Sequence, residues 1–131
     1  ALTATAVDTT ALQYAKMASI APAATFGLVE TAASLSRQGG ATVHVGAVIT
    51  SPLFYDPDET NVPAWKRTGH LGVEMEAAML YTLAAVHRVE ALAMMAVSDL
   101  ITDTESIRIS DAELKRGVDD MMRIACAVAV S

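Results

Sequence analysis

The sequence predicts an α/β fold built around a largely parallel sheet, and two observations favour this class. Residues 41–50 and 89–97 are predominantly apolar over the length of a buried strand. Segments with helical patterns lie between and around them, roughly at 23–37, at 77–87 and after Ser110. Strands that alternate with helices pair in parallel and are joined by right-handed crossovers.

Composition predicts one small domain, residues 1–131, with an apolar interior. The chain is 53% hydrophobic, with a mean hydropathy of +0.37 and a net charge of -6. It has no run of Lys or Arg, which argues against a nucleic acid polymer as partner. No apolar run approaches the ~18 residues of a membrane span, so no membrane partner is expected. The single Cys126 cannot form an intrachain disulfide, which fits a reducing compartment such as the cytoplasm. It lies in an apolar helix, so we expect inert core rather than the alternative, a reactive thiol.

The first fifty residues predict strand, helix and strand. Residues 1–7 alternate loosely, as a strand does. A helical segment follows at 23–37, and the glycine pair at 39–40 supplies a left-handed stop. Residues 41–50 are β-branched and apolar, which predicts a buried strand.

The next stretch predicts an exposed loop and a short helix. Residues 53–59 are polar apart from their start, and they include the adjacent aromatics Phe54 and Tyr55. Residues 63–68 can form a short helix that Gly69 ends.

The stretch around which the chain is organised is Gly-Val-Glu-Met-Glu-Ala-Ala at 72–78, which places two carboxylates where a helix begins. That helix is expected to run to about His87. Residues 89–97 then predict a buried strand that ends at Ser98 and Asp99. Ligands sit outside the carboxyl ends of parallel strands, so we expect the chemistry at these ends.

After Asp99 the chain turns polar and is long enough to form a loop over a site. Ser110 and Glu113 have the spacing of a capping box. The last helix carries apolar residues on one face, at positions 114, 118, 121 or 122, 125 and 128.

The residue pattern leaves carboxylates as the candidate functional groups. One Cys and three scattered His give no zinc-ligand spacing, and no nucleophile elbow or phosphate-cradling glycine pattern is present. Glu74 and Glu76 would point apart on a helix but share a face if extended. They either complement the helix macrodipole, or Glu76 accepts hydrogen bonds from neighbouring hydroxyls of a polyol such as a sugar.

Asp99 is open to two interpretations. It can cap a turn together with Ser98. It can also act as a general acid, which requires a raised pKa supplied by burial at the end of an apolar strand.

Four short stretches carry a family resemblance. Residues 72–78 followed by Ala-Val-Ser-Asp at 96–99 resemble the nucleoside phosphorylase family of the bacterial hexameric type. Ser-Pro-Leu-Phe-Tyr-Asp-Pro-Asp at 51–58 is similar to the loop that precedes this motif in purine-cleaving members. Asp-Met-Met-Arg-Ile-Ala at 120–125 resembles the start of their closing helix. The resemblance covers the whole chain and matches the C-terminal half of such an enzyme.

The resemblance implies a three-layer α/β/α fold around a mixed, partly barrel-like sheet, of which this chain covers roughly the second half. It implies reversible phosphorolysis of purine nucleosides, with inorganic phosphate as co-substrate and no cofactor. Asp99 would protonate N7 of the purine, and Ser98 would position Asp99. The substrate-binding residues would be Glu76 on the ribose hydroxyls, Met75 on the sugar, Val73 and Phe54 on the base, and Glu74.

Two departures from the family pattern matter. The loop after Ser-Asp is about two residues longer than in purine-cleaving relatives, so the position of their assisting Arg falls near Leu114. Arg116, which we predict as catalytic, or Arg108 would substitute. The phosphate-binding residues of the preceding half also have no match here. We therefore expect a second chain or segment to carry that half, in a homo-oligomer that the resemblance makes a hexamer, a trimer of dimers.

Three alternatives remain. A nucleosidase that cleaves methylthioadenosine or adenosylhomocysteine would also carry Glu-Met-Glu and Ser-Asp, but its loop usually reads Ser-Gly-Asp. A uridine phosphorylase is the second alternative, but those relatives generally lack an Asp at the position of Asp99. A non-catalytic nucleoside-binding fragment would bind without turnover. Phosphate dependence of base release distinguishes the first alternative from a phosphorylase.

Overall fold

A computed structural model describes residues 3–6, 21–102 and 105–131. The chain forms two compact units. Of the described residues, 3–6, 21–30 and 44–93 belong to the first unit, and 31–43, 94–102 and 105–131 belong to the second. Of the helices in the described ranges, none combines the length and the apolar composition that crossing a bilayer requires.

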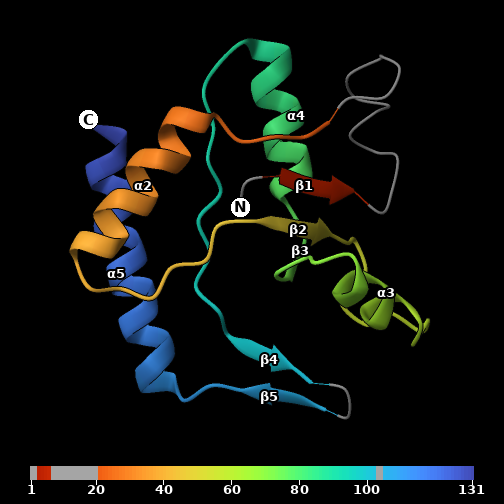
Figure 1. The fold of residues 1–131 in the computed structure, drawn as a ribbon. Coiled ribbons are helices and arrows are strands. Elements are labelled where there is room, and N and C mark those ends of the chain that lie inside the picture. The colour runs from red at the N-terminus through yellow and green to blue at the C-terminus, as the bar shows by residue number, and fades with distance from the viewer. Residues whose placement is uncertain (1–2, 7–20, 103–104) are drawn as a thin grey trace. The chain divides into compact units, whose positions relative to one another are not determined.

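The first unit is built on a parallel sheet of three short strands, β1 (Thr3–Ala6), β2 (Ala47–Thr50) and β3 (Val73–Glu74), in that order (Figure 1). Parallel pairing and a first strand within residues 1–7 are thus confirmed for the described residues. The strand predicted at 41–50 is shorter than expected, because the β1 ladder pairs only with its last four residues. Residues 41–46 lie in a loop.

Two residues separate β3 from helix α4 (Ala77–His87), which begins where the carboxylate stretch predicted. Its buried face packs with β2 in a core of Val48, Ala77, Ala78 and Tyr81. Small alanines let this helix approach the sheet closely. The Tyr81 hydroxyl accepts a hydrogen bond from the backbone N–H of Ala93 (3.1 Å). Burial raises the pKa of Tyr81, partly offset by the Ala93 hydrogen bond.

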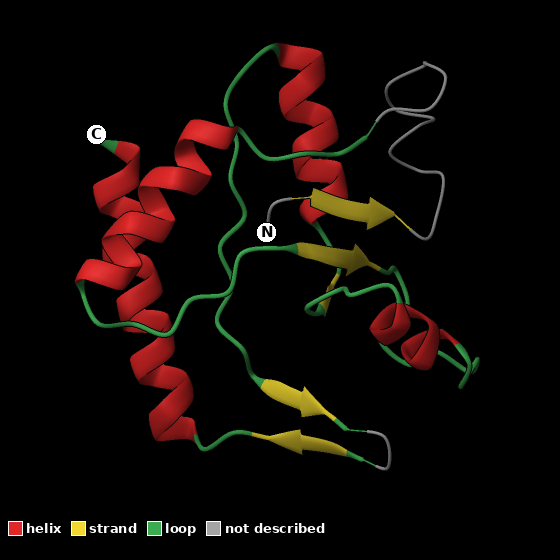
Figure 2. Ribbon diagram, viewed as in Figure 1, coloured by secondary structure: helices red, strands yellow, loops and turns green. Residues whose placement is uncertain are grey.

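The buried strand predicted at 89–97 is wrong for this structure. Figure 2 draws the segment between α4 and β4 (Asp99–Ile101) as loop. An apolar run predicts burial, but a strand also needs a neighbour for its ladder. Here Ala91 pairs with Thr25 instead of with a strand. The N–H of Ala91 donates to the Thr25 hydroxyl (3.1 Å), and the carbonyl of Ala91 accepts from the Thr25 N–H (2.9 Å). Val89, Met95 and Val97 are exposed.

Residues 51–60 and helix α3 (Asn61–Arg67) confirm the predicted exposed loop and short helix. Gly69 follows with φ +76°, the left-handed conformation expected of a helix stop. Within the loop, Asp58 accepts hydrogen bonds from the hydroxyl and the N–H of Thr60. These bonds lower the pKa of Asp58.

The second unit contains the C-terminal part of helix α2 (Phe26–Gln38), helix α5 (Asp111–Ala129) and a β-hairpin. The hairpin pairs β4 with β5 (Ser106–Arg108) in antiparallel fashion, where the sequence predicted only a polar loop. Gly40, with φ +74°, follows α2 as the predicted left-handed stop.

Helix α5 begins with the predicted capping box, in which Ser110 and Glu113 bond reciprocally. Its buried residues, Ile124 and Val128, are four apart and so share a face. Cys126 lies two residues from each, on another side, and is exposed. The expectation that Cys126 belongs to the core is therefore wrong.

Candidate functional site

The carboxyl ends of β2 and β3 lie next to each other, and this juxtaposition builds one part of the site. Thr50 and Glu74 are register partners in the parallel ladder. Helix α4 starts immediately beyond, so the residues that link β3 to α4 stand at the edge where parallel sheets present ligand-binding groups (Figure 1).

The Glu74 carboxylate holds the start of α4. Its Oε2 accepts hydrogen bonds from the N–H groups of Glu76 (2.7 Å) and Ala77 (2.6 Å), and its Oε1 accepts one from the Thr50 hydroxyl. The interpretation as an acidic residue that complements a helix N-terminus is confirmed for Glu74. Its substrate contact stays a prediction, and both carboxylate oxygens already have protein partners.

Thr50 completes the capping of α4. Its Oγ1 accepts a hydrogen bond from the N–H of Ala78 (3.0 Å) while its proton goes to Glu74. Thr50 is not among the site residues that the sequence predicts. A polar residue at the end of an apolar strand was the available signal, but its partners lie 24 and 28 positions away.

Glu76 is the N-cap residue of α4, yet its side chain makes no capping hydrogen bond. It is exposed, and within the described ranges its carboxylate has no hydrogen bond or ion pair. Two acceptor oxygens therefore remain open to a ligand. The neighbouring Val73 and Met75 are exposed as well, and they provide apolar surface on the same short connection.

Phe54 lies in the loop after β2, in the same unit as Glu76. The Ser51 hydroxyl oxygen accepts a hydrogen bond from the Leu53 N–H (3.2 Å), which shapes the start of this loop. The Phe54 and Tyr55 rings pack edge to face, with centroids 5.0 Å apart. Phe54 is 78% exposed, so its ring face is available to stack on a planar ligand.

Asp99 opens the β4–β5 hairpin in the second unit. Its Oδ2 accepts a hydrogen bond from the Ser98 hydroxyl (2.6 Å) and lies 3.9 Å from Nη1 of Arg108, the residue directly across the hairpin. Its Oδ1 has no protein partner among the described residues. The expected burial is wrong: the Asp99 side chain is 40% exposed, because the preceding segment forms no strand.

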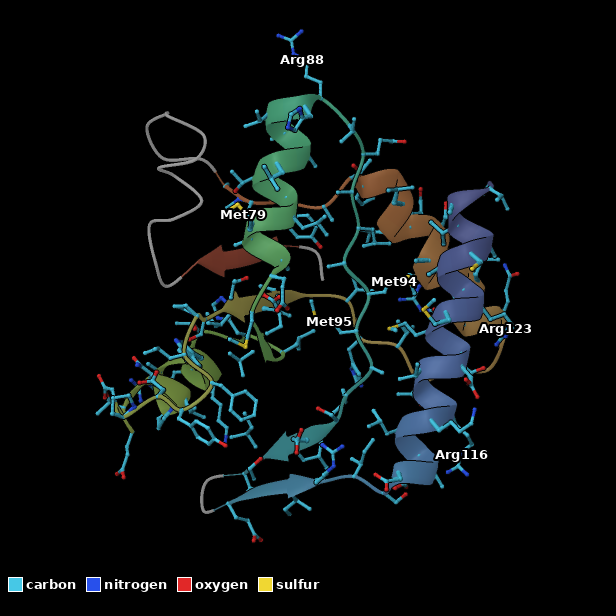
Figure 3. All side chains as sticks on the ribbon, turned by 180° about the vertical axis from the view of Figure 1, so that it is seen from behind. Met79, Arg88, Met94, Met95, Arg116 and Arg123 are labelled. Carbon is cyan, nitrogen blue, oxygen red and sulfur yellow. The ribbon has the colours of Figure 1, made fainter. Side chains whose placement is uncertain are left out.

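Arg116, predicted to assist Asp99, lies on α5 and forms no ion pair with Asp99 among the residues that the structure describes. Figure 3 shows it projecting from the side of α5 away from the hairpin. The pKa of Glu113 is lowered chiefly by the Ser110 hydroxyl, then by the Ser110 N–H, and to a smaller extent by the charge of Arg116. Arg108, the other candidate, is the one placed opposite Asp99.

The predicted site residues therefore fall into two groups. The first unit brings together the four consecutive residues 73–76 and also holds Phe54. The second unit brings together Ser98 and Asp99, with Arg108 beside them.

Comparison with known proteins agrees with the family resemblance seen in the sequence. The model of the phosphorylase superfamily matches residues 3–129. A protein of Jannaschia sp. (strain CCS1), named purine nucleoside phosphorylase DeoD-type, is 37% identical over 131 residues, which is all of this chain and 55% of that protein. A protein with the same name from Exiguobacterium sp. (strain ATCC BAA-1283 / AT1b) is 40% identical over 84% of this chain and 46% of its own length. Another, from Roseobacter denitrificans, is 38% identical over 98% of this chain and 54% of its own length. The chain spans about half the length of the curated relatives it matches.

Proposed function

This chain belongs to the phosphorylase superfamily, and from that premise we propose that the protein catalyses the reversible phosphorolysis of purine nucleosides. A purine nucleoside and phosphate would give the free purine base and ribose 1-phosphate. The relatives that cover most of this chain bear the name of that activity. The chain would supply the groups that bind the nucleoside and protonate its base.

Glu76 would hold the sugar. Its exposed carboxylate has no side-chain partner in the described part of the chain, so it can accept hydrogen bonds from two neighbouring ribose hydroxyls. Met75 would pack against the sugar, and Val73 and Phe54 would line the base pocket with the phenyl ring against the purine. Glu74 would contribute through the position of α4, since its Oε2 accepts hydrogen bonds from the N–H groups of Glu76 and Ala77.

Asp99 would act as general acid. As the bond between C1′ of the ribose and N9 of the purine breaks, its electron pair moves onto the purine, and Asp99 gives a proton to N7. An oxygen of phosphate bonds to C1′. Ser98 and Arg108 both contact Oδ2 of Asp99, so Oδ1 would be the oxygen that faces the substrate. One positioned proton donor typically contributes 10²–10⁴-fold in rate.

A cation beside Asp99 would steady the carboxylate as the proton leaves. Arg108 is the better-supported candidate, because the hairpin places it opposite Asp99. Arg116 would need a different arrangement of the start of α5 to reach it. Both arginines belong to the second unit, so substitution of each is a direct comparison.

Phosphate would bind mainly to a segment outside these 131 residues. A phosphate dianion needs several fixed cationic or N–H donors. The relatives are about twice as long as this chain, so a second chain or a preceding segment would carry that half. For the whole protein we propose a three-layer α/β/α fold with a partly barrel-like sheet, a homo-hexamer as trimer of dimers, a cytoplasmic location and no cofactor other than the co-substrate phosphate.

The observation that carries the proposal is the exposed Glu76 carboxylate at the start of α4, in a chain that matches its family model from residue 3 to residue 129. The test is release of base from inosine and adenosine by the full protein, with and without phosphate. We expect release only with phosphate, together with ribose 1-phosphate. Equal release in phosphate-free buffer would indicate a nucleosidase, and binding without release would indicate a non-catalytic nucleoside-binding protein.

A further inference from the structure

Thr50 occupies a special place between the sheet and α4. It is the last residue of β2, is 9% exposed, and uses its hydroxyl twice. The hydroxyl donates to Oε1 of Glu74 on β3 and accepts from the N–H of Ala78 in the first turn of α4. One side chain thus ties two strands and a helix together.

The contacts continue from Thr50 to Glu76 through Glu74. The second carboxylate oxygen of Glu74 accepts from the N–H groups of Glu76 and Ala77. The Glu76 side chain has no partner of its own in the described part of the chain, so its placement depends on its backbone. That backbone is held by Glu74, and Glu74 is held by Thr50.

We propose that Thr50 is a positioning residue, which sets where the Glu76 carboxylate meets the ribose hydroxyls. This inference rests on the proposed function, since it assigns Glu76 to the sugar. The Thr50 hydroxyl makes no contact with substrate itself. It acts by fixing the Glu74 carboxylate, and through it the first turn of α4.

The hydrogen bond between the Thr50 hydroxyl and the Glu74 carboxylate is of a kind that can position Glu76. A hydroxyl that donates to a carboxylate forms a charge-assisted hydrogen bond, which is stronger and better oriented than a bond between neutral groups. Without the hydroxyl, Glu74 loses one of its partners and the Ala78 N–H loses its acceptor in a buried place. The start of α4 would then relax, and a displacement of about 1 Å at a binding group can cost about 10²-fold in rate.

A double-mutant cycle tests the proposal in the full protein. Thr50→Val removes the hydroxyl at nearly constant volume, and Glu76→Gln weakens the sugar contact. The matched control is Thr82→Val, because Thr82 is also buried and its hydroxyl bonds to the Ala78 carbonyl (2.7 Å) without touching Glu74. The readout is kcat/KM for inosine, with amide hydrogen exchange at Glu76 and Ala77 as a direct measure of the helix start.

Glu76→Gln reduces kcat/KM by some factor in the wild type. We expect that factor to be about tenfold smaller in the Thr50→Val background, which is within the range of coupling found between residues of one hydrogen-bond network. In the Thr82→Val background, Glu76→Gln should keep its full effect. Amide exchange should accelerate at Glu76 and Ala77 in Thr50→Val, and Thr50→Ser, which retains the hydroxyl, should restore both readouts.

Two results would overturn the proposal, and they differ from failure of the proposed function. Thr50 does not position Glu76 if Glu76→Gln lowers kcat/KM by the same factor in the wild type and in Thr50→Val. The same conclusion follows if amide exchange at Glu76 and Ala77 is unchanged in Thr50→Val. If Glu76→Gln alone leaves kcat/KM unchanged, the assignment of Glu76 to the sugar fails first. Should Thr50→Val not fold, Thr50→Cys, whose thiol is a weaker donor, takes its place in the same cycle.

Discussion

At the scale of single residues, the site shows how environment separates chemically identical side chains. Glu74 and Glu76 are two positions apart, but only the Glu74 carboxylate has protein partners among the described residues, since its Oε2 accepts from two backbone N–H groups and its Oε1 accepts from the Thr50 hydroxyl. Glu76 keeps its carboxylate open at the surface. Glu74 caps a helix, whereas the Glu76 carboxylate is open to a ligand, although neither residue type nor spacing distinguishes the two.

The position opposite Asp99 gives a prediction for the two arginines. Arg108→Gln should lower kcat/KM for inosine about fivefold, because an exposed ion pair is worth up to about 1 kcal/mol. Arg116→Gln is the matched comparison, with the same charge change in the same unit, and it should have the smaller effect. Steady-state kinetics of both variants decides the matter. A larger loss in Arg116→Gln would reject Arg108 as the partner of Asp99.

Residue-level prediction succeeded where the contacts are local. A carboxylate at the helix start, an exposed aromatic loop and the capping pair could all be predicted from neighbours within a few positions. Thr50 could not, because its hydroxyl bonds to residues 24 and 28 positions ahead. The burial expected of Asp99 depended on a strand before it, and that strand is absent from the described structure.

At the scale of elements, the start of α5 is set by its own sequence, and we expect it to respond to pH. Hydrogen bonds from Ser110 lower the pKa of Glu113, so the folded-state value lies below the unfolded one. The stabilisation is therefore present above the unfolded pKa and is lost as the pH falls through the folded pKa. We expect amide exchange in the first turn of α5 to accelerate on acidification below the ordinary Glu range.

Ser110→Ala is the control for that pH dependence. Loss of an N-cap hydroxyl usually costs about 1 kcal/mol, measured by urea unfolding. The acid-dependent change in the first turn should also become smaller in the variant, because Glu113 loses its hydroxyl partner and keeps only the N–H of residue 110. An unaltered pH profile in Ser110→Ala would mean that another group causes the change.

The end of α4 offers a stabilising substitution. Arg88 has φ 56° and ψ 44°, the left-handed conformation that normally favours glycine, and the N–H of Val89 bonds to the carbonyl of Ala84 as in a Schellman motif. Arg88→Gly should stabilise the chain by about 0.5–1 kcal/mol, since it removes the steric cost at Cβ.

Gly40→Ala provides the opposite case for the same measurement. Gly40 has φ +74° after α2, and no heavy atom would crowd an added Cβ, so only the backbone conformation opposes it. The variant should lose about 1 kcal/mol of stability in urea unfolding. If Arg88→Gly destabilises as well, the αL strain at Arg88 is not the dominant effect.

Helices and the first strand were predictable from the sequence to within a few residues, whereas the strand expected at 41–50 is shorter and the one expected at 89–97 is absent from the described structure. Helical periodicity and stop signals such as Gly40 and Gly69 are local. A strand exists only where another backbone pairs with it, and residues 41–46 and 89–97 lack such a partner in the described structure. Their apolar composition indicated burial but could not provide the neighbouring strand.

At the scale of the whole molecule, the length of the relatives sets the limits of what this chain can do. The chain covers about half of each, and its predicted site residues lie in two compact units. We predict that the 131-residue chain alone binds purine nucleosides but does not cleave them. Calorimetry, phosphorolysis assays and intact-mass measurement on one sample test this. A single species of 13.7 kDa with full activity would contradict it.

The central claim is that Asp99 gives a proton to N7 of the departing purine. The base of inosine needs that proton in order to leave. In 7-methylinosine the purine already carries a fixed positive charge, so its base can leave without a proton from Asp99. The most direct measurement is kcat of Asp99→Asn in the full protein with each substrate. We expect turnover of inosine to fall by about 10²–10⁴-fold while most of the turnover of 7-methylinosine is retained. An equal loss with both substrates would contradict the assignment.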